Sequence, residues 1–412
     1  MKQPEKNSSV FYGTWVLAAI WLVYFFTTTP ISYGTSVIST KIVLEYGWNE
    51  GIIGLASSMN YLLIVLTSIP GGVLEQKKGY RFTIILGAAV GTLAFLFLSL
   101  FYSDPVLYVA MFGAAGICAA LCGLTSGPSL INEWYARNKA LPMAILMTAG
   151  SVGGFLMPLV AQAVSDVSIQ ACFLLYMGMV GSCILLALFV IRDHPQDVGE
   201  IRDGRRWTAA HPVKETASTQ TNSRSKTPSE CCRSRTFLLF SLQLITSRAI
   251  GIGINSYVVL YAIQNGVSPM RAAFLLTVYN IFNCFGRLLS GFSDRLPVST
   301  RSLNLICFFL QAAGAVLLSL VPGFVPFAVS CAIAGFGFGI YCTLWPLLIV
   351  SLFGSENFTV LNGTCNTVGC IGSAASPTVV YLIASALGGY SVAFLTLGLL
   401  GLLCIITVPA MK

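Results

Sequence analysis

The chain alternates between long apolar runs and short polar connections. A transmembrane α-helix needs about 20 mostly apolar residues, and the sequence contains twelve segments of that kind. To within several residues they cover 12–38, 51–73, 81–102, 106–130, 141–163, 170–191, 236–262, 271–293, 302–321, 325–350, 358–384 and 389–410. The pattern predicts an all-α membrane protein with twelve transmembrane helices in two six-helix bundles.

One long polar stretch interrupts this pattern between the sixth and seventh runs. It divides the chain into a short N-terminal tail (1–11), a six-helix bundle (12–191), a linker (192–235) and a second six-helix bundle (236–410). The linker is rich in charge, Ser, Thr and Pro. Such a composition buries little apolar surface, so we expect the linker to be flexible and largely disordered.

Lys and Arg are unevenly shared between the two predicted faces of the membrane. One face carries nine cations of the linker together with Lys2, Lys6, Lys77, Lys78, Arg81, Arg137, Lys139, Arg295 and Arg301. The other carries only Lys41 and Arg271, beside Glu45, Glu50, Asp104 and Asp166. Because cytoplasmic loops carry the excess of Lys and Arg, we expect both termini to be cytoplasmic, in a cell membrane of the plasma or inner type.

The composition supports the membrane interpretation. Hydrophobic residues make up 56% of the chain and charged residues 9%, and the mean hydropathy is +0.80. The net charge of +8 comes mostly from loops, so we take it as topological information and expect no nucleic-acid partner. The 13 cysteines are scattered singly without metal-ligand spacing. They are typical of reduced cysteines packed in a membrane core, and we expect no metal and no cofactor.

Two arginines, Arg248 and Arg287, lie inside the apolar runs, whereas no acidic residue or histidine is predicted to lie there. A charge in the hydrocarbon region costs about 2.5–3.5 kcal/mol on insertion scales, so such a residue indicates a functional site unless it reaches the interface. Two interior cations without an acidic partner favour a site for an anion.

Several different short motifs follow one another along the chain. They lie at 11–16, 31–34 and 45–48, at 133–139, at 192–199, at 286–295 and at 352–354. In order and spacing they resemble the oxalate/formate antiporter-like and monocarboxylate-porter branches of the major facilitator superfamily, over nearly the whole chain except the linker. The resemblance implies two six-helix halves with the substrate site at the midplane between them.

The superfamily's signature between the second and third spans appears here at 72–81. Gly72, Lys77, Gly79 and Arg81 match it, whereas Gln76 stands in place of the usual Asp. A shortened counterpart after the eighth span keeps Asp294 and Arg295. The resemblance implies that these six matching residues act at the cytoplasmic gate, and that Gln76 weakens one charge pair of it.

In these families an arginine of the eighth span holds the substrate carboxylate, and Arg287 matches it by its Gly-Arg-x-x-x-Gly context. A guanidinium offers a planar fork to two carboxylate oxygens and keeps its proton. Four residues earlier, proton-coupled porters carry Asp, whereas this chain has Asn283, as in the exchangers. The alternative is that Arg287 reaches the cytoplasmic rim or pairs with Asp294.

Arg248 lies about twelve residues into the seventh span, roughly 18 Å along a helix and thus near the midplane. The exchangers carry a lysine in the eleventh span, whereas the matching place here, near Gly369, has none. We expect Arg248 to supply that second positive charge. The alternative is a structural arginine beside a helix break at Gly251, or one that reaches the cytoplasmic side.

Neutral donors of suitable depth complete the predicted site, because a Tyr hydroxyl or an Asn amide orients a carboxylate. They are Tyr33, which matches a family tyrosine, and Asn255, Tyr61, Tyr257, Tyr279, Tyr341 and Trp345.

Together these observations predict a monomeric secondary transporter of small organic anions, mono- or dicarboxylates, that works by alternating access through exchange or facilitated transport. A proton-coupled symporter of the lactate or pyruvate type is the first alternative, and a non-transporting membrane receptor is the second. An enzyme is disfavoured, because the apolar runs hold no nucleophile–base or metal constellation.

Overall fold

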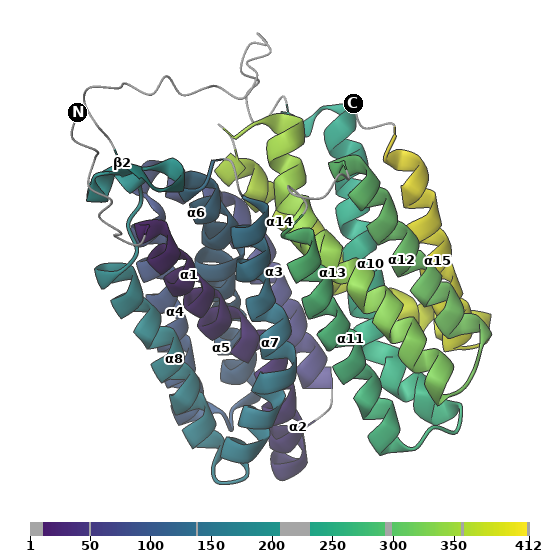
Figure 1. Ribbon diagram of the computed structural model, residues 1–412. Coiled ribbons are helices and arrows are strands. Elements are labelled where there is room, and N and C mark those ends of the chain that lie inside the picture. Colours follow the sequence, from purple (N-terminus) through teal and green to yellow (C-terminus); the bar gives the residue numbers. More distant parts are fainter. Residues whose placement is uncertain are drawn as a thin grey trace.

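The computed structural model describes residues 11–48, 51–136, 139–206, 231–292, 299–355 and 358–409, which form two bundles of long helices side by side (Figure 1). Within these residues, twelve helices are long and apolar enough to cross a membrane. The prediction of an all-α protein with twelve spans is therefore confirmed.

The N-terminal bundle contains two π-helical segments. Its elements are α1 (Tyr12–Thr29), η1 (Pro30–Gly34), α2 (Thr35–Tyr46), α3 (Gly51–Lys78), α4 (Tyr80–Phe101), α5 (Pro105–Cys118), η2 (Ala119–Thr125), α6 (Ser126–Trp134), α7 (Ala140–Ser165) and α8 (Ile169–Phe189). Both π segments, η1 and η2, continue directly into α-helix, so the first and fourth spans are unbroken helices that each contain a local change of pitch.

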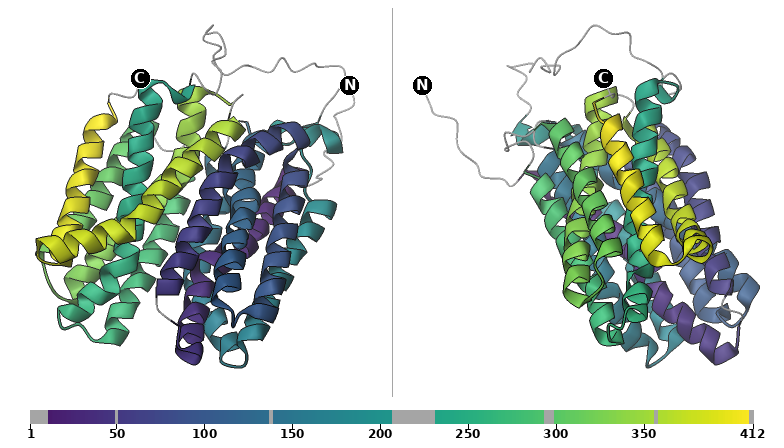
Figure 2. Two further views of the ribbon diagram at one scale, coloured as in Figure 1. Left: turned by 180° about the vertical axis from the view of Figure 1, so that it is seen from behind. Right: turned by 90° about the vertical axis from the view of Figure 1, so that its right-hand side faces the viewer.

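The C-terminal bundle consists of continuous α-helices, which are α10 (Arg235–Gln264), α11 (Pro269–Ser290), α12 (Thr300–Leu320), α13 (Phe324–Phe353), α14 (Phe358–Leu387) and α15 (Tyr390–Thr407). The start of α1 and the end of α15 lie at the same end of the molecule in all views (Figures 1 and 2). We call this end, which also holds the turn between α3 and α4, the terminal face.

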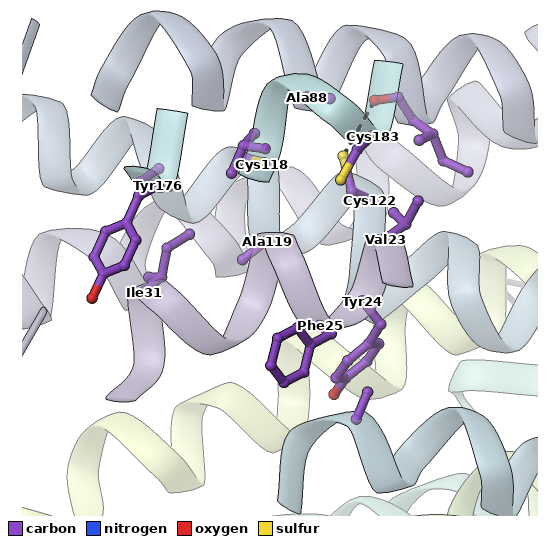
Figure 3. Close-up of a cluster of buried hydrophobic side chains, with 14 of the residues drawn as sticks. Val23, Tyr24, Phe25, Ile31, Ala88, Cys118, Ala119, Cys122, Tyr176 and Cys183 are labelled. Carbon is purple, nitrogen blue, oxygen red and sulfur yellow. Dashed lines mark hydrogen bonds between the residues drawn. The ribbon is translucent and has the colours of Figure 1, made fainter. Parts of the chain in front are cut away.

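Small residues bring the helices of each bundle into close contact. In the N-terminal bundle an added Cβ at Gly91 would lie 2.6 Å from Cys118 Sγ, and one at Gly87 would lie 2.7 Å from Cys122 Sγ. Cys118, Cys122 and Cys183 share this core with Tyr24 and Phe25 of α1 (Figure 3). These cysteines thus act as small apolar residues, and no disulfide is found among the described residues.

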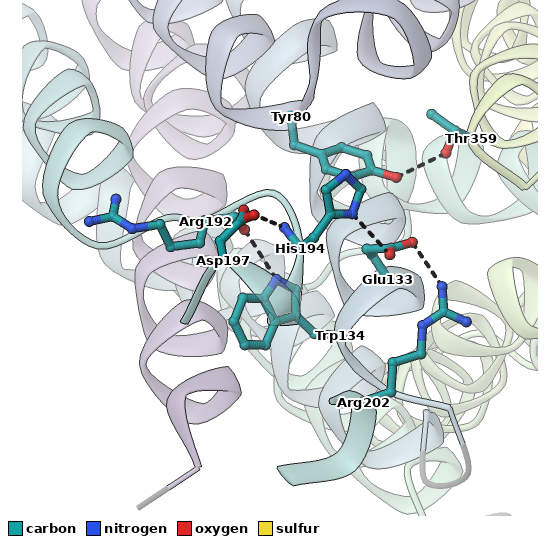
Figure 4. A network of polar contacts seen from close by, with 8 residues as sticks. All are labelled: Tyr80, Glu133, Trp134, Arg192, His194, Asp197, Arg202 and Thr359. Atoms are coloured by element: carbon teal, nitrogen blue, oxygen red, sulfur yellow. Dashed lines mark hydrogen bonds and ion pairs between the residues drawn. The ribbon is translucent and has the colours of Figure 1, made fainter. Parts of the chain in front are cut away.

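The first part of the linker is folded, unlike the largely disordered segment that its composition predicts. It forms η3 (Pro195–Val198), β1 (Glu200–Ile201), η4 (Arg202–Gly204) and β2 (Arg205–Arg206), and β1 pairs antiparallel with β2. Glu133 of α6 holds this segment through His194 at 3.1 Å and Arg202 at 3.0 Å, and Trp134 Nε1 donates to the Arg192 carbonyl (Figure 4). Polar contacts around Glu133, together with the packing of Pro195 and Val198, therefore hold this segment on the N-terminal bundle.

The two bundles touch mainly through two helix pairs, α3 with α14 and α7 with α11, and to a lesser extent where α13 meets α7 and where α14 meets η2 and α6. Backbones approach closely in the first pair, since an added Cβ at Gly363 would lie 2.4 Å from the Ser68 carbonyl oxygen. Asn366 Nδ2 donates to Ser68 Oγ at 3.0 Å, and Asn362 Nδ2 donates to the Thr125 carbonyl at 3.1 Å. Both contacts run from the terminal face toward the middle of the bundles, so the protein is closed at the terminal face.

We expect Gly363→Ala to weaken this closure. The added methyl would meet backbone rather than a flexible side chain, and such overpacking costs about 1–3 kcal/mol. Gly178→Ala is the matched control, because nothing lies within 4 Å of its Cβ position. In detergent, Gly363→Ala should lower the midpoint of thermal unfolding while Gly178→Ala leaves it unchanged or raises it. Equal effects of the two variants would contradict the close contact.

Candidate functional site

Arg287 lies on α11 where this helix faces α7 of the other bundle, and its side chain is 7% exposed. Its Nε donates to Asn283 Oδ1 at 2.8 Å, and its Nη1 donates to the carbonyl oxygen of Met147 on α7. An added Cβ at Gly150 would lie 2.9 Å from Nη1, so only a glycine leaves room for the guanidinium there. Arg287 therefore points into the contact between the bundles and does not reach the rim.

Asn283 supports this arginine from the preceding turn of α11. Its Oδ1 accepts from Arg287 Nε and also from Ser151 Oγ of α7, at 3.2 Å. The helix that carries it is pressed against α13, because an added Cβ at Gly339 would lie 2.1 Å from the Asn283 carbonyl oxygen. The Asn283–Arg287 pair is thus set by packing on two sides.

Arg248 comes from α10, which runs unbroken past Gly251. Its side chain is half-buried, and no hydrogen bond or ion pair to it is found among the described residues. It lies against α14, where an added Cβ at Gly369 would be 3.6 Å from Arg248 Nε. The Arg248 side chain therefore fills the space next to Gly369, the position at which the resemblance implies a lysine.

Tyrosines of the N-terminal bundle face both arginines. The hydroxyls of Tyr24 and Tyr33 each lie within electrostatic range of Arg248 and Arg287. Tyr61 lies within range of Arg248 and packs on Cys370 of α14. Asn255 follows Arg248 by seven residues, about 10.5 Å along the helix axis, and is half-buried. These side chains surround a site that carries two positive charges.

Four other predicted members of the site are engaged elsewhere. The Tyr257 hydroxyl donates to the Pro377 carbonyl at 3.0 Å, and its ring stacks on Tyr390. Tyr341 and Trp345 belong to the apolar core of the C-terminal bundle, 1% and 3% exposed. The Tyr279 hydroxyl donates to the Gly251 carbonyl at 3.3 Å, although Tyr279 remains in electrostatic range of Arg287. Packing accounts for Tyr257 and Trp345 without a ligand, whereas the Tyr341 hydroxyl is buried without a hydrogen-bond partner and lies within electrostatic range of Arg248.

Two residues near the arginines were missed by the sequence analysis, namely Tyr24 and Cys342 of α13. Tyr24 precedes Tyr33 by nine positions, which places them on opposite sides of a regular α-helix. Tyr33 lies inside the π segment η1, whose wider turn rotates its side chain away from the regular α-helical direction, and the structure brings it within electrostatic range of Tyr24. No sequence signal announced this segment beyond Pro30.

The predicted gate residues lie at the terminal face. Gly79 has φ of +89°, and an added Cβ would lie 2.4 Å from Asp193 Oδ2. The Arg81 backbone N–H donates to Asp193 at 2.8 Å, and its side chain donates to carbonyls at the end of α8. Gly72 lies against α14, since an added Cβ there would be 2.8 Å from the Thr359 carbonyl oxygen. Lys77 is exposed. Asp294 and Arg295 lie outside the described residues.

A polar pair of the same face involves Lys139, just before α7. Its Nζ donates to Asn132 Oδ1 at 2.6 Å. Burial, and secondarily the nearby Arg202, lower the pKa of Lys139 to about 8. This amine therefore loses its proton more readily than an ordinary lysine.

One buried acid contradicts the expectation that no acidic residue lies inside a span. α3 continues to Lys78, five residues beyond the predicted end of the second span, and Glu75 within it is 2% exposed. Ser126 Oγ of α6 lies 2.6 Å from its Oε1. The error arose because the apolar run fades before the helix ends.

Comparisons with known proteins agree with this architecture. The family model described as Major Facilitator Superfamily matches residues 20–377. Monocarboxylate transporter 12 of Mus musculus is 24% identical, with 94% of this chain and 82% of that protein covered, and the probable hexose phosphate transport protein of Chlamydia pneumoniae is 22% identical over 72% and 67%. The crystal structure of the transporter FucP in the outward conformation superposes with a TM-score of 0.73 at 15% identity, covering 96% of this chain and 98% of that one.

We expect Asn283→Ala to destabilise the fold, because it leaves the buried Arg287 Nε without its acceptor, at a cost of about 1–3 kcal/mol. Asn283→Asp keeps an acceptor and adds a countercharge, so it should be at least as stable as the wild type. Asn280→Ala is the control, since Asn280 donates only to Leu276 of its own helix. Thermal unfolding should rank Asn283→Ala lowest, and a loss as large in Asn280→Ala would refute the role of Asn283.

Proposed function

The chain belongs to the major facilitator superfamily of membrane transporters, and we propose that it carries small carboxylate anions by alternating access. It is a multi-pass membrane protein and not an enzyme. We propose further that it acts as a monomer in a plasma or inner cell membrane with both termini cytoplasmic. The charge pattern of the loops supports this orientation.

The observation that carries the proposal is the pair of interior arginines without an acidic partner. Arg287 is held by neutral oxygens only, and Arg248 has no hydrogen-bond acceptor among the described residues. A carboxylate supplies the missing charge, and charge-assisted hydrogen bonds contribute about 1.5–3 kcal/mol each. The name of the mouse relative, monocarboxylate transporter 12, supports the same substrate class.

Of the two modes expected from the sequence, exchange and facilitated transport, the two cations favour exchange, because facilitated transport needs the empty protein to return. Closing both ends around an empty site would bury two positive charges that repel each other in a medium of low dielectric constant. A bound anion removes this penalty. Movement of the bundles is therefore expected to require an anion on each passage, and the presence of two arginines suits a dianion or a polar carboxylate.

Proton-coupled transport of a monocarboxylate is the second candidate. Glu75 favours it over the expectation from sequence, because the chain does contain a buried acid. Asn283 disfavours it, because this position next to Arg287 holds an amide that cannot accept a proton. Substrate-driven pH change inside vesicles separates the two coupling modes.

We expect counterflow of radiolabelled carboxylates in proteoliposomes, tested with lactate, pyruvate, formate and oxalate. Arg287→Gln should raise the half-saturating concentration by roughly ten- to hundredfold, which corresponds to a lost contact of about 1.5–3 kcal/mol. Arg248→Gln should do the same for a dianion. Arg271→Gln is the matched control, because Arg271 is exposed and lies over the Phe324 ring.

Three outcomes decide between the possibilities. Loss in both interior variants supports a two-arginine anion site. Loss in Arg287→Gln alone makes Arg248 structural and favours a monocarboxylate. Absence of counterflow with every anion, in wild-type protein shown to be folded, would overturn the carboxylate proposal.

A further inference from the structure

Glu75 is a fully enclosed carboxyl group at the terminal-face end of α3. It precedes the last residue of the helix by three positions, about 4.5 Å along the axis. Ser126 Oγ contacts its Oε1, whereas its Oε2 has no hydrogen-bond partner. The hydroxyls of Thr125 and Ser129 lie beside the carboxyl, yet Ser129 Oγ also lacks a partner. Such a group is expensive to bury as an unpaired charge.

Counting hydroxyl hydrogens shows which form of the acid fits. Ser126 Oγ lies 2.6 Å from Glu75 Oε1 and 2.5 Å from the carbonyl oxygen of Leu121. A carbonyl only accepts, and a hydroxyl has one hydrogen, so an ionised Glu75 leaves one of these short contacts without a hydrogen. If Glu75 carries a proton, it donates to Ser126, and Ser126 donates to Leu121. Both contacts are then satisfied.

The hydroxyl of Thr125, like that of Ser126, already donates its hydrogen to a carbonyl oxygen. Its Oγ1 donates to the Ala120 carbonyl at 2.9 Å, so it presents only a lone pair to the neighbouring carboxyl. The π segment η2 causes this arrangement, because its widened turn leaves the carbonyls of Ala120 and Leu121 available to Thr125 and Ser126. Two of the three hydroxyls beside the acid thus already have carbonyl acceptors, and the single proton of a neutral carboxylic acid supplies the hydrogen that the Ser126 contact lacks.

No cation faces the acid among the described residues. The titratable groups in its range are Tyr80 of α4 and Cys122 of η2, both neutral at physiological pH, and α14 contributes Thr359 and Asn362. On α3 itself, Lys77 and Lys78 are exposed. Neutralisation therefore has to come from a small cation that fits within the cluster.

We propose that Glu75 is a proton-binding site whose occupancy is required for closure of the terminal face. One turn before it, Gly72 packs on the Thr359 backbone of the opposite bundle. Beside it, Asn362 of the opposite bundle donates to the Thr125 carbonyl, and the Tyr80 and Thr359 hydroxyls lie 3.3 Å apart. Separation of α3 from α14 would admit water to this cluster and let the acid ionise, whereas closure expels water and requires the proton.

The position of Glu75 makes this effect one-sided. Because the carboxyl lies about one turn from the helix end, it exchanges its proton with the water of the terminal face and not with the opposite side. The proton is thus a regulator of closure rather than cargo. The inference concerns the gate and stands whether or not the arginine site takes carboxylates.

Infrared spectroscopy of the reconstituted full-length protein tests the site without any substrate. At neutral pH the wild type should show the carbonyl stretch of a protonated carboxylic acid, and Glu75→Gln should lack it. Ser126→Ala should keep the band but shift it, since the acid loses its acceptor. A band of equal intensity in Glu75→Gln, or no band in the wild type, would overturn the proposal. Loss of the band on adding Na⁺ at constant pH would likewise overturn it in favour of a sodium site.

Vesicles of known orientation test the coupling. In the wild type, the rate of counterflow should change at least severalfold with the pH at the terminal face and little with the pH on the other side. Glu75→Gln mimics the neutral acid and should flatten this profile, whereas Glu133→Gln at the same face should retain it. An unchanged profile in Glu75→Gln refutes the coupling. If no carboxylate is transported but the infrared band behaves as expected, the carboxylate proposal fails and the proton site stands.

Discussion

A polar group buried in a lipid-embedded protein has no water to pair with and is costly to leave without a partner, and this constraint organises the contact between the two bundles. Arg287 meets it through Asn283 of its own helix and the Met147 carbonyl of the opposite bundle. The amides of Asn362 and Asn366 of α14 meet it in the same manner, by donating to η2 and to α3 of the opposite bundle. Polar side chains at this contact therefore hold the closed arrangement, and the same atoms are freed when the bundles separate.

The closed arrangement depends equally on the absence of side chains. Gly150 makes room for the Arg287 guanidinium, and Gly363 lets the backbone of α14 approach that of α3. Without a hydrophobic driving force between helices in lipid, close packing and hydrogen bonds supply the attraction. A contact built from glycines and a few hydrogen bonds can be broken and formed again at low cost, as the proposed alternating access requires.

The sequence predicted the architecture well because the length of apolar runs is set by the bilayer. It predicted Arg287, Asn283 and Arg248 because charge and amide groups are rare in such runs, and the structure brings these residues to the contact between bundles. It gave the depth of Tyr257, Tyr341 and Trp345 but not their direction around the helix, and the structure packs these three rings within the C-terminal bundle. The prediction of a largely disordered linker was wrong for residues 192–206, because amino-acid composition does not reveal the individual contacts that hold this segment.

Two further failures have a common origin in helix geometry. A π segment rotates the side chains within it and after it around the helix axis, relative to a regular α-helix. This rotation concealed the relation between Tyr24 and Tyr33. The end of α3 extends past the apolar run, which concealed Glu75. Analysis of hydrophobic periodicity treats each helix as regular and expects it to end where polar residues begin. The first condition fails near the arginines, and the second fails at the terminal face.

Arg248 shows why position in space matters more than position along the chain. Its Nε lies 3.6 Å from the place where a Gly369 side chain would begin, so a cation carried by α10 occupies the volume next to α14. The field that an anion experiences depends on the location of the charge and not on the helix that supplies it. A long arginine on one helix and a glycine on the next can therefore replace a lysine on the second helix. In the proposed site the number of positive charges would then stay the same, with Arg287 at its matching position and Arg248 on a different helix from the lysine.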